Sequence, residues 1–450
     1  MDHPAYYDCK ITDLLCLSSA FGYVGLAVGI VIGVFTWYSW QKNLKDNAKT
    51  TLPPGSLGLP FLGETLEFVR AYKANKFMED FINPRVAKYG QVFKTHVLFS
   101  PLVFLGPPEG NKFLFSNENN LVQASWPSSI HKLLGRHSIM VKIGEEHKKG
   151  RQILSSFFGP IGLQSFVLRM HETTRAHFEQ FWEKKDEIMA GTLLKKITFS
   201  LAIDLFMSIK EGPEFDTLAH DMNTYSVGFF ALPLNFLGTT YHKATLAREK
   251  MLHTLDITIR QKRKDMEEGK ISPRQDLLSI LINTLNDQGH LATNEEIKDN
   301  ILVLLSASHD TTSNTLAVVL KYLFLNPHCL QEVIKEQKKI AMEKVGDLLC
   351  WKLAWSGPRS HLSSQFFPYP ERFNPSHFEG IGPQPFTYLP FGGGPRICPG
   401  SEFARIEMVI FLHHLVLNYE WSMIDPFEKM TMKPLPTFQK GLQLRIHKKD

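Results

Sequence analysis

Cysteine is scarce in this chain: its 450 residues include five, which are Cys9, Cys16, Cys329, Cys350 and Cys398. An odd, widely spaced set does not form the disulfide framework of a small secreted protein. No two of them stand in a CxxC pair, so a structural zinc site of that kind is not indicated. The low cysteine content fits a reducing compartment for the bulk of the chain.

Long runs of one charge are also absent. The 50 basic and 45 acidic residues leave a net charge of +5, and no long basic block of the kind that a nucleic-acid binder needs is present. The mild excess fits either a mixed solvated surface or a basic patch that meets an acidic partner or an anionic membrane. With 43% hydrophobic and 21% charged residues, the chain is too apolar to be disordered and can bury a large core.

Several common enzyme motifs are missing. There is no GxGxxG, no phosphate-binding loop and no GxSxG nucleophile elbow. The segment 171–175, His-Glu-Thr-Thr-Arg, lacks the second histidine of the zinc motif HExxH. These absences exclude the usual signatures of dinucleotide binding, phosphoryl transfer, serine hydrolysis and zinc proteolysis.

The amino terminus carries one long uncharged stretch, from Leu14 to Trp40. At about 1.5 Å per residue such a helix crosses a hydrocarbon core of about 30 Å. Aromatic residues close the stretch, lysines follow it, and the leader before it is acidic, which places the carboxyl-terminal side in the cytoplasm. A cleaved signal peptide is the alternative, but it favours a basic leader and a shorter apolar core. We predict a membrane anchor in residues 1–50 and one domain in 51–450, joined by the proline-rich stretch 52–60.

The remainder is predicted to be mainly α-helical with small β-sheets. Helical periodicity runs over 144–158, 163–184, 192–209, 243–268, 275–286, 293–325 and 401–418, and strand patterns over 91–97, 101–105 and 441–446.

The segment 293–325 stands out. Thr293 and Glu296 have the spacing of a capping box, and residues 301–305 are apolar on every face, which predicts a buried helix. Its middle, residues 306–313, then turns polar. Polar groups in a buried helix cost free energy unless they are paired, so this conflict indicates a functional segment.

The most specific signal is the loop 391–400, Phe-Gly-Gly-Gly-Pro-Arg-Ile-Cys-Pro-Gly. Its glycines permit close approach of the backbone to a flat ligand. Cys398 precedes a helix predicted to begin at Ser401, where free N–H groups and the helix dipole favour a thiolate. Arg396 has the planar fork that pairs with carboxylates. The alternative is a buried structural cysteine after a glycine turn.

This loop matches FxxGxRxCxG at every fixed position, and the chain thereby resembles the cytochromes P-450. The resemblance implies the cytochrome P-450 fold and a haem whose iron is held by the Cys398 thiolate. It assigns Phe391 and Arg396 to the cofactor site. Arg151, four residues after His147, corresponds to a propionate-binding arginine, although the family usually has tryptophan where His147 stands.

Residues 307–312 resemble the family's oxygen-binding segment. Asp310 and Thr311 correspond to its acid–alcohol pair, which delivers protons as a positioned acid. Ser308 replaces the usual second glycine. Alternatively, these hydroxyls simply donate to the carbonyl four residues earlier.

The stretches 111–119 and 232–235 resemble plant oxidases of triterpenes, similar to beta-amyrin oxidases. The resemblance implies a large apolar terpenoid or sterol-like substrate, dioxygen, and NADPH-derived electrons from a reductase. It also implies a single-pass protein of the endoplasmic reticulum membrane with its catalytic domain on the cytoplasmic side.

One expected feature is missing. The family carries an ExxR helix before the segment that resembles residues 370–373, Pro-Glu-Arg-Phe, and none is found in 324–390. We place a deletion near Trp351. Arg372 would then be buried without partners, which costs about 3–5 kcal/mol. A catalytically inactive membrane-bound isoform is therefore an alternative. A haem protein that does not activate oxygen is a further one, which the intact Asp310–Thr311 pair disfavours.

Overall fold

The computed structural model describes residues 28–38, 52–59, 62–97, 100–183, 185–285, 291–343, 361, 363–370, 372–432 and 435–449. These fall into two compact units, Met1–Gly106 and Pro107–Asp450, each described by itself below. The predicted boundary at residue 50, most of the predicted anchor and the predicted deletion near Trp351 lie outside the described residues.

The first unit packs short helices on a two-stranded sheet. Helix α2 (Thr65–Lys73), a π-helical turn (Phe77–Ile82) and α3 (Asn83–Tyr89) precede the antiparallel strands β1 (Val92–Val97) and β2 (Ser100–Leu105). Phe81 and Phe93 are fully buried in its small core. Arg85 fixes the helices by pairing with Glu64 at 3.0 Å and Glu67 at 2.6 Å.

Within the described residues, no single helix is both long and apolar enough to cross a membrane. The segment Val28–Tyr38 is a shorter apolar helix. The helix pair Gly144–Gln164 and Val167–Phe181, bent by 75°, is long and apolar enough for a broken membrane span, but only by its length and composition. The predicted anchor therefore stays a prediction.

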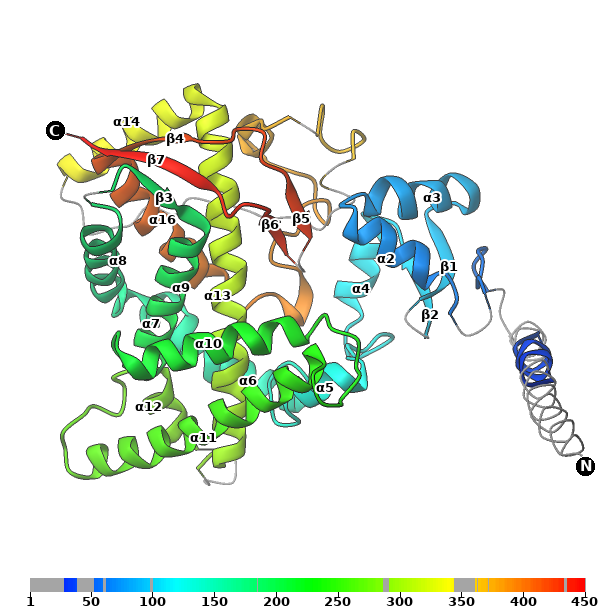
Figure 1. Cartoon of the computed structure of the whole chain (residues 1–450), viewed down its shortest axis with the longest axis horizontal. Coiled ribbons are helices and arrows are strands. Elements are labelled where there is room, and N and C mark those ends of the chain that lie inside the picture. Colours follow the sequence, from blue (N-terminus) through cyan, green and yellow to red (C-terminus); the bar gives the residue numbers. More distant parts are fainter. Residues whose placement is uncertain are drawn as a thin grey trace, which may run out of the picture. The chain divides into compact units, whose positions relative to one another are not determined.

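The second unit is mainly helical, as the periodicity predicts (Figure 1). Two predicted ranges agree residue for residue with the helices α6 (Gly144–Phe158) and α16 (Ser401–Asn418). The predicted helix 163–184 is divided between α7 (Pro160–Gln164) and α8 (Val167–Phe181). The remaining helices are α4 (Glu109–Ser116), α5 (Ser128–Leu134), α9 (Ala190–Met207), α10 (Pro213–Gly228), α11 (Thr240–Glu267), α12 (Leu277–Ile282), α13 (Asn294–Leu325) and α14 (Pro327–Glu343).

Helix α13 is the long helix through the middle of this unit (Figure 1). Its predicted capping box is present: the Thr293 hydroxyl accepts from the Glu296 N–H, and the Glu296 carboxylate accepts from the Thr293 N–H. Residues 301–305 are all buried, as their all-round apolar character predicts. Helix α9 packs along it, where the Thr198 hydroxyl donates to the His309 carbonyl at 3.1 Å.

Two small antiparallel sheets complete the unit. One has the order β3 (Glu187–Met189), β7 (Gln443–Lys448), β4 (Tyr419–Met423), and the other pairs β5 (Met430–Met432) with β6 (Pro436–Phe438). The predicted strand 441–446 corresponds to β7, which lies two residues further on. The carboxyl terminus is thus tied by β7 to the strand that precedes α9.

The capping box gives a direct test of what starts α13. Thr293→Ala removes the acceptor for the Glu296 N–H and is expected to lower the free energy of unfolding by about 1 kcal/mol. Urea denaturation of the variant measures this. Thr254→Ala, in the middle of α11, is the control because its hydroxyl only donates to the Lys250 carbonyl. Equal losses in the two variants would contradict a capping role.

Candidate active site

The loop before α16 presents the Cys398 thiol. The Cys398 N–H donates to the Phe391 carbonyl at 2.9 Å, which closes the loop on itself. Gly394 has a φ of +62°, and a Cβ there would collide with the Phe115 carbonyl. Only glycine therefore lets α4 approach the loop so closely. The Phe391 ring is half-buried.

The electrostatics of the thiol are mixed. Burial raises the pKa of Cys398, while the Gly400 N–H and the positive charge of Arg151 lower it without reversing the rise. The Gly400 N–H at the helix start thus favours the thiolate, as predicted, but in the polypeptide alone desolvation has the larger effect on the pKa of Cys398. A metal cation held by the Cys398 sulfur would supply the missing stabilisation of the thiolate, since metal binding displaces the thiol proton.

Arg151 lies on α6 close enough for its charge to act on Cys398. Within the described part of the chain it has no hydrogen-bonding or ionic partner, and burial lowers its pKa. The buried His147 lies on the same helix. Burial lowers its pKa, and the charges of Arg396 and Arg151 lower it further. The structure therefore brings Arg151, Arg396 and Cys398 close to His147 or to one another.

Arg396 is held differently from Arg151. Its Nε donates to Glu118 Oε1 at 2.7 Å and its Nη2 to the Lys142 carbonyl at 2.9 Å (the Glu118 side chain is 11% exposed). Glu118 and Lys142 were not predicted from the sequence as parts of this site. The sequence signal for Glu118 was its place as an acidic residue in the stretch 111–119. Nothing in that stretch indicates which residue Glu118 pairs with.

Asp310 and Thr311 lie on the middle of α13. Asp310 Oδ1 is 3.0 Å from Lys195 Nζ on α9. Burial alone would raise the pKa of Asp310, but nearby charges and hydrogen bonds lower it overall. The charges of His309 and Lys195, together with hydrogen bonds from Lys195 and Ser226, cause this lowering of the Asp310 pKa.

Thr311 occupies the exposed side of the helix. Thr311 and Ala307, one turn earlier, are exposed in the middle of α13, whose neighbouring residues are buried or half-buried. The Thr311 hydroxyl donates to the Ala307 carbonyl at 2.7 Å, the back-bonding anticipated as an alternative, and its oxygen stays free to accept. Among the described residues, no hydrogen bond or ion pair joins this pair to Cys398.

The prediction that Arg372 is buried without partners is wrong. It is exposed, with its guanidinium 4.9 Å above the ring of Tyr369, rather than buried without partners. The cost of a buried unpaired charge therefore does not apply. Its neighbour Glu371 lies outside the described residues.

Comparison with known proteins decides the family. The cytochrome P450 family model matches residues 53–352 and 355–445. This chain belongs to the cytochrome P450 family. Beta-amyrin 28-monooxygenase of Solanum lycopersicum is 38% identical, the match covering 90% of this chain and 94% of the relative. Beta-amyrin 16-beta-monooxygenase of Platycodon grandiflorus is 35% identical, over 94% and 98% respectively.

Among solved structures, the cyanobacterial cytochrome CYP120A1 bound to retinoic acid superposes with a TM-score of 0.76 at 28% identity. The superposition covers 88% of this chain and 99% of that chain. The family fold, mainly helical with small sheets, is thereby established. By this membership the chain is a haem-thiolate monooxygenase that uses dioxygen and electrons from a reductase.

The residues present fit that cofactor. The site offers one cysteine sulfur next to a helix start, and a half-buried arginine without an acidic partner in the described residues. The sulfur suits an iron ligand and the arginine suits a propionate. The exposed strip formed by Ala307 and Thr311 leaves the middle of α13 open to a ligand.

Glu407 is a buried acid that sequence analysis missed. It lies on α16, is 1% exposed, and neither carboxylate oxygen has a hydrogen-bond partner of good geometry. Burial raises its pKa well above 4.5, and the nearby Thr312 hydroxyl lowers it only slightly. Burial thus favours the neutral carboxyl of Glu407 over its carboxylate. The sequence signal was a carboxylate directly before the apolar run 408–412 on α16.

Replacing Glu407 tests this directly. A carboxylic acid whose pKa is raised in the folded state stabilises the fold below its unfolded pKa of about 4.5, and that contribution is lost as pH rises. Between that value and the folded-state pKa of Glu407, this group alone should lower the wild-type free energy of unfolding by about 1.4 kcal/mol per pH unit. In Glu407→Gln this part of the decline should vanish, as measured by urea denaturation at pH 5, 6, 7 and 8.

Glu332→Gln, at an exposed position on α14, is the control and should keep the wild-type pH dependence. If Glu407→Gln also keeps it, Glu407 is ionised in the folded protein.

Proposed function

We propose that this chain oxidises a large apolar terpenoid by inserting one oxygen atom from dioxygen into a C–H bond. The observation that supports it most is the Cys398 loop with Arg151 nearby, which has no partner among the described residues, in a chain whose relatives include beta-amyrin monooxygenases. Haem, when bound, supplies the oxygen activation. Cys398 would hold its iron, and Arg151 and Arg396 its propionates, with Phe391 packing at the same site.

Proton delivery is the work of the chain's own residues. The Lys195 side chain is 40% exposed and contacts Asp310, so it connects that carboxylate to solvent. Asp310 would take up a proton at Oδ1 and pass it through water to the Thr311 hydroxyl on the exposed strip. The three residues form a path from the surface to the open face of α13.

An apolar surface supports uptake of a lipid-soluble substrate. The connector 229–239 between α10 and α11 exposes Phe230 (64%), Leu232 (72%) and Leu237 (88%). Such a group of large exposed apolar side chains marks a surface that contacts lipid or an apolar partner. We propose that it faces the endoplasmic reticulum membrane. The anchor in residues 1–50 would hold the catalytic domain on the cytoplasmic side, where an NADPH-dependent reductase supplies electrons.

A second candidate is a catalytically inactive membrane-bound isoform. Residues 324–390 contain no ExxR, and the family match is interrupted at 353–354, close to the predicted deletion near Trp351. This alternative predicts an expressed protein that does not assemble with haem.

The carbon monoxide difference spectrum of the reduced, membrane-expressed chain distinguishes the two candidates. The monooxygenase should give a thiolate-type Soret band that is lost in Cys398→Ser and retained in Cys329→Ser, a free cysteine on α14. Incubation with beta-amyrin, NADPH and a plant reductase should then yield a product heavier by one oxygen atom. Absence of the band from well-expressed wild-type protein would favour the inactive isoform.

The proton path has its own test. In Lys195→Met, burial is no longer opposed by that cation, so the pKa of Asp310 should rise. The acidic limb of the pH–rate profile should move to higher pH and kcat should fall by about 10-fold or more, with the carbon monoxide spectrum unchanged. Lys210→Met is the control because Lys210 pairs with Asp204 instead. An unchanged profile in Lys195→Met would remove Lys195 from the path.

A further inference from the structure

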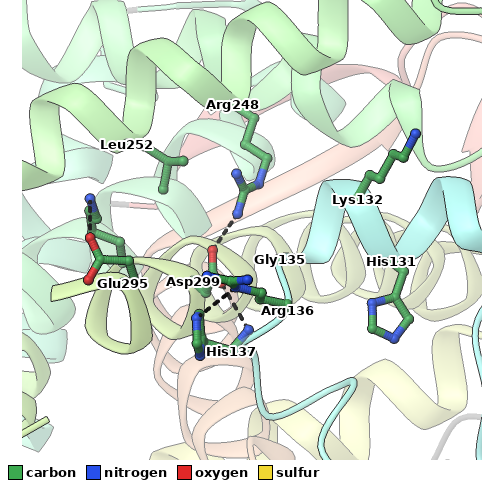
Figure 2. A pocket seen from close by; sticks show the side chains of 10 residues that line it. His131, Lys132, Gly135, Arg136, His137, Arg248, Leu252, Glu295 and Asp299 are labelled. Carbon is green, nitrogen blue, oxygen red and sulfur yellow. Dashed lines mark hydrogen bonds and ion pairs between the residues drawn. The ribbon is translucent and has the colours of Figure 1, made fainter. Parts of the chain in front are cut away.

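A cavity lies away from the residues that were assigned to the candidate active site. It has a volume of about 400 Å³ and is lined by the end of α5 with the segment after it, by α11 and by the first turns of α13. Its lining residues are His131, Lys132, Gly135, Arg136, His137, Arg248, Leu252, Glu295, Lys298 and Asp299. Figure 2 shows Arg248 and Arg136 on one side of the opening and Lys132 and His131 on the other.

The charges in this lining do not cancel. Four cationic side chains face two carboxylates. Asp299 is paired with Arg248, while Lys298 is paired with Asp256 at 3.0 Å and Glu295 at 3.7 Å.

Lys132 and Arg136 are the two lining cations that are not paired with a carboxylate among the described residues. Both are exposed, and within the described residues no carboxylate lies within 4 Å of either. Arg136 Nε donates to His137 Nε2 at 3.1 Å, which orients the guanidinium and leaves its two terminal nitrogens available. The cavity therefore presents uncompensated positive charge with free N–H donors.

The residues behind these two cations are held in place by hydrogen bonds within the protein, before any ligand binds. Arg248 Nε donates to the Leu133 carbonyl at 2.8 Å while its Nη2 contacts Asp299. Asp299 also accepts from the His137 N–H at 3.1 Å. Gly135, at a φ of +83°, is required here because a Cβ would collide with the Asp299 carboxylate.

The next residue of α13 fixes the same segment again. Asn300 Oδ1 accepts from the Ile139 N–H at 2.8 Å, and Asn300 Nδ2 donates to the His137 carbonyl at 3.3 Å. A site whose wall is already ordered loses little entropy when a ligand binds.

We propose that this cavity binds the oxyanion group of a small molecule, a phosphate or a carboxylate. Arg136 and Lys132 would contact the anion and Arg248 would form the positive wall behind it. Guanidinium groups match the planar geometry of both oxyanions and bind them through paired N–H donors. The volume exceeds that of the anion itself, and Leu252 offers an apolar contact for the rest of the molecule.

Isothermal titration of the detergent-solubilised full-length chain tests the proposal, with inorganic phosphate and acetate as probes at constant ionic strength. Saturable binding of one equivalent is expected. Arg136→Gln and Lys132→Gln should each weaken it on the order of 10-fold, the loss of one charge-assisted hydrogen bond. Glu295→Gln should strengthen it, because a carboxylate leaves the lining.

Arg274→Gln, at an exposed arginine outside the lining, is the matched control and should bind as the wild type does. Saturation by phosphate alone or by acetate alone identifies which oxyanion the site takes. The proposal is overturned if neither probe saturates, or if Arg274→Gln weakens binding as much as Arg136→Gln. Circular dichroism of each variant excludes loss of folding as the cause.

Discussion

Helix α13 is buried along much of its length, and its buried and half-buried aspartates are paired with cations on other helices. Asp299 is paired with Arg248 on α11, and Asp310 with Lys195 on α9. Buried polar groups are costly unless paired, so these partners fix which helices surround α13 and in which register. The candidate active site and the anion cavity are both consequences of this requirement, at different turns of one helix.

Thr312 and Glu407 are the exception to that rule. Both are buried, and neither has a partner of good geometry among the described residues. A protonated acid is the least costly state for such a position, because a neutral carboxyl loses far less hydration than a carboxylate. The second unit therefore stays packed around α16 at the expense of one neutralised side chain, directly behind the strip that carries Thr311.

The sequence was most informative where structure depends on neighbouring residues. The limits of α6 and α16, the capping box of α13 and the conformation of Gly394 follow from local periodicity, capping and turn chemistry. Helices α10 and α14 were missed. The apolar repeat is weak in α10, but α14 has a clear amphipathic repeat that the sequence prediction overlooked. In β7 the alternation was recognised but its limits were misplaced by two residues.

Long-range pairs were the part that the sequence could not supply. Glu118 and Arg396 are 278 residues apart, and Lys195 and Asp310 are 115 residues apart, so nothing local links them. The predicted burial of Arg372 failed for a related reason. It was transferred from a family arrangement whose other members were not found in this chain, and the arginine lies instead at the surface over Tyr369.

The attachment of residues 133–139 to α11 and α13 has a consequence for their dynamics. The amides of His137 and Ile139 belong to an irregular segment, yet they are bonded to Asp299 and Asn300 on the long buried helix. An amide exchanges its hydrogen only when its bond opens, and these bonds open only if α13 or the segment moves as a whole. Residues outside regular structure should thus exchange as slowly as a core helix and unfold together with it.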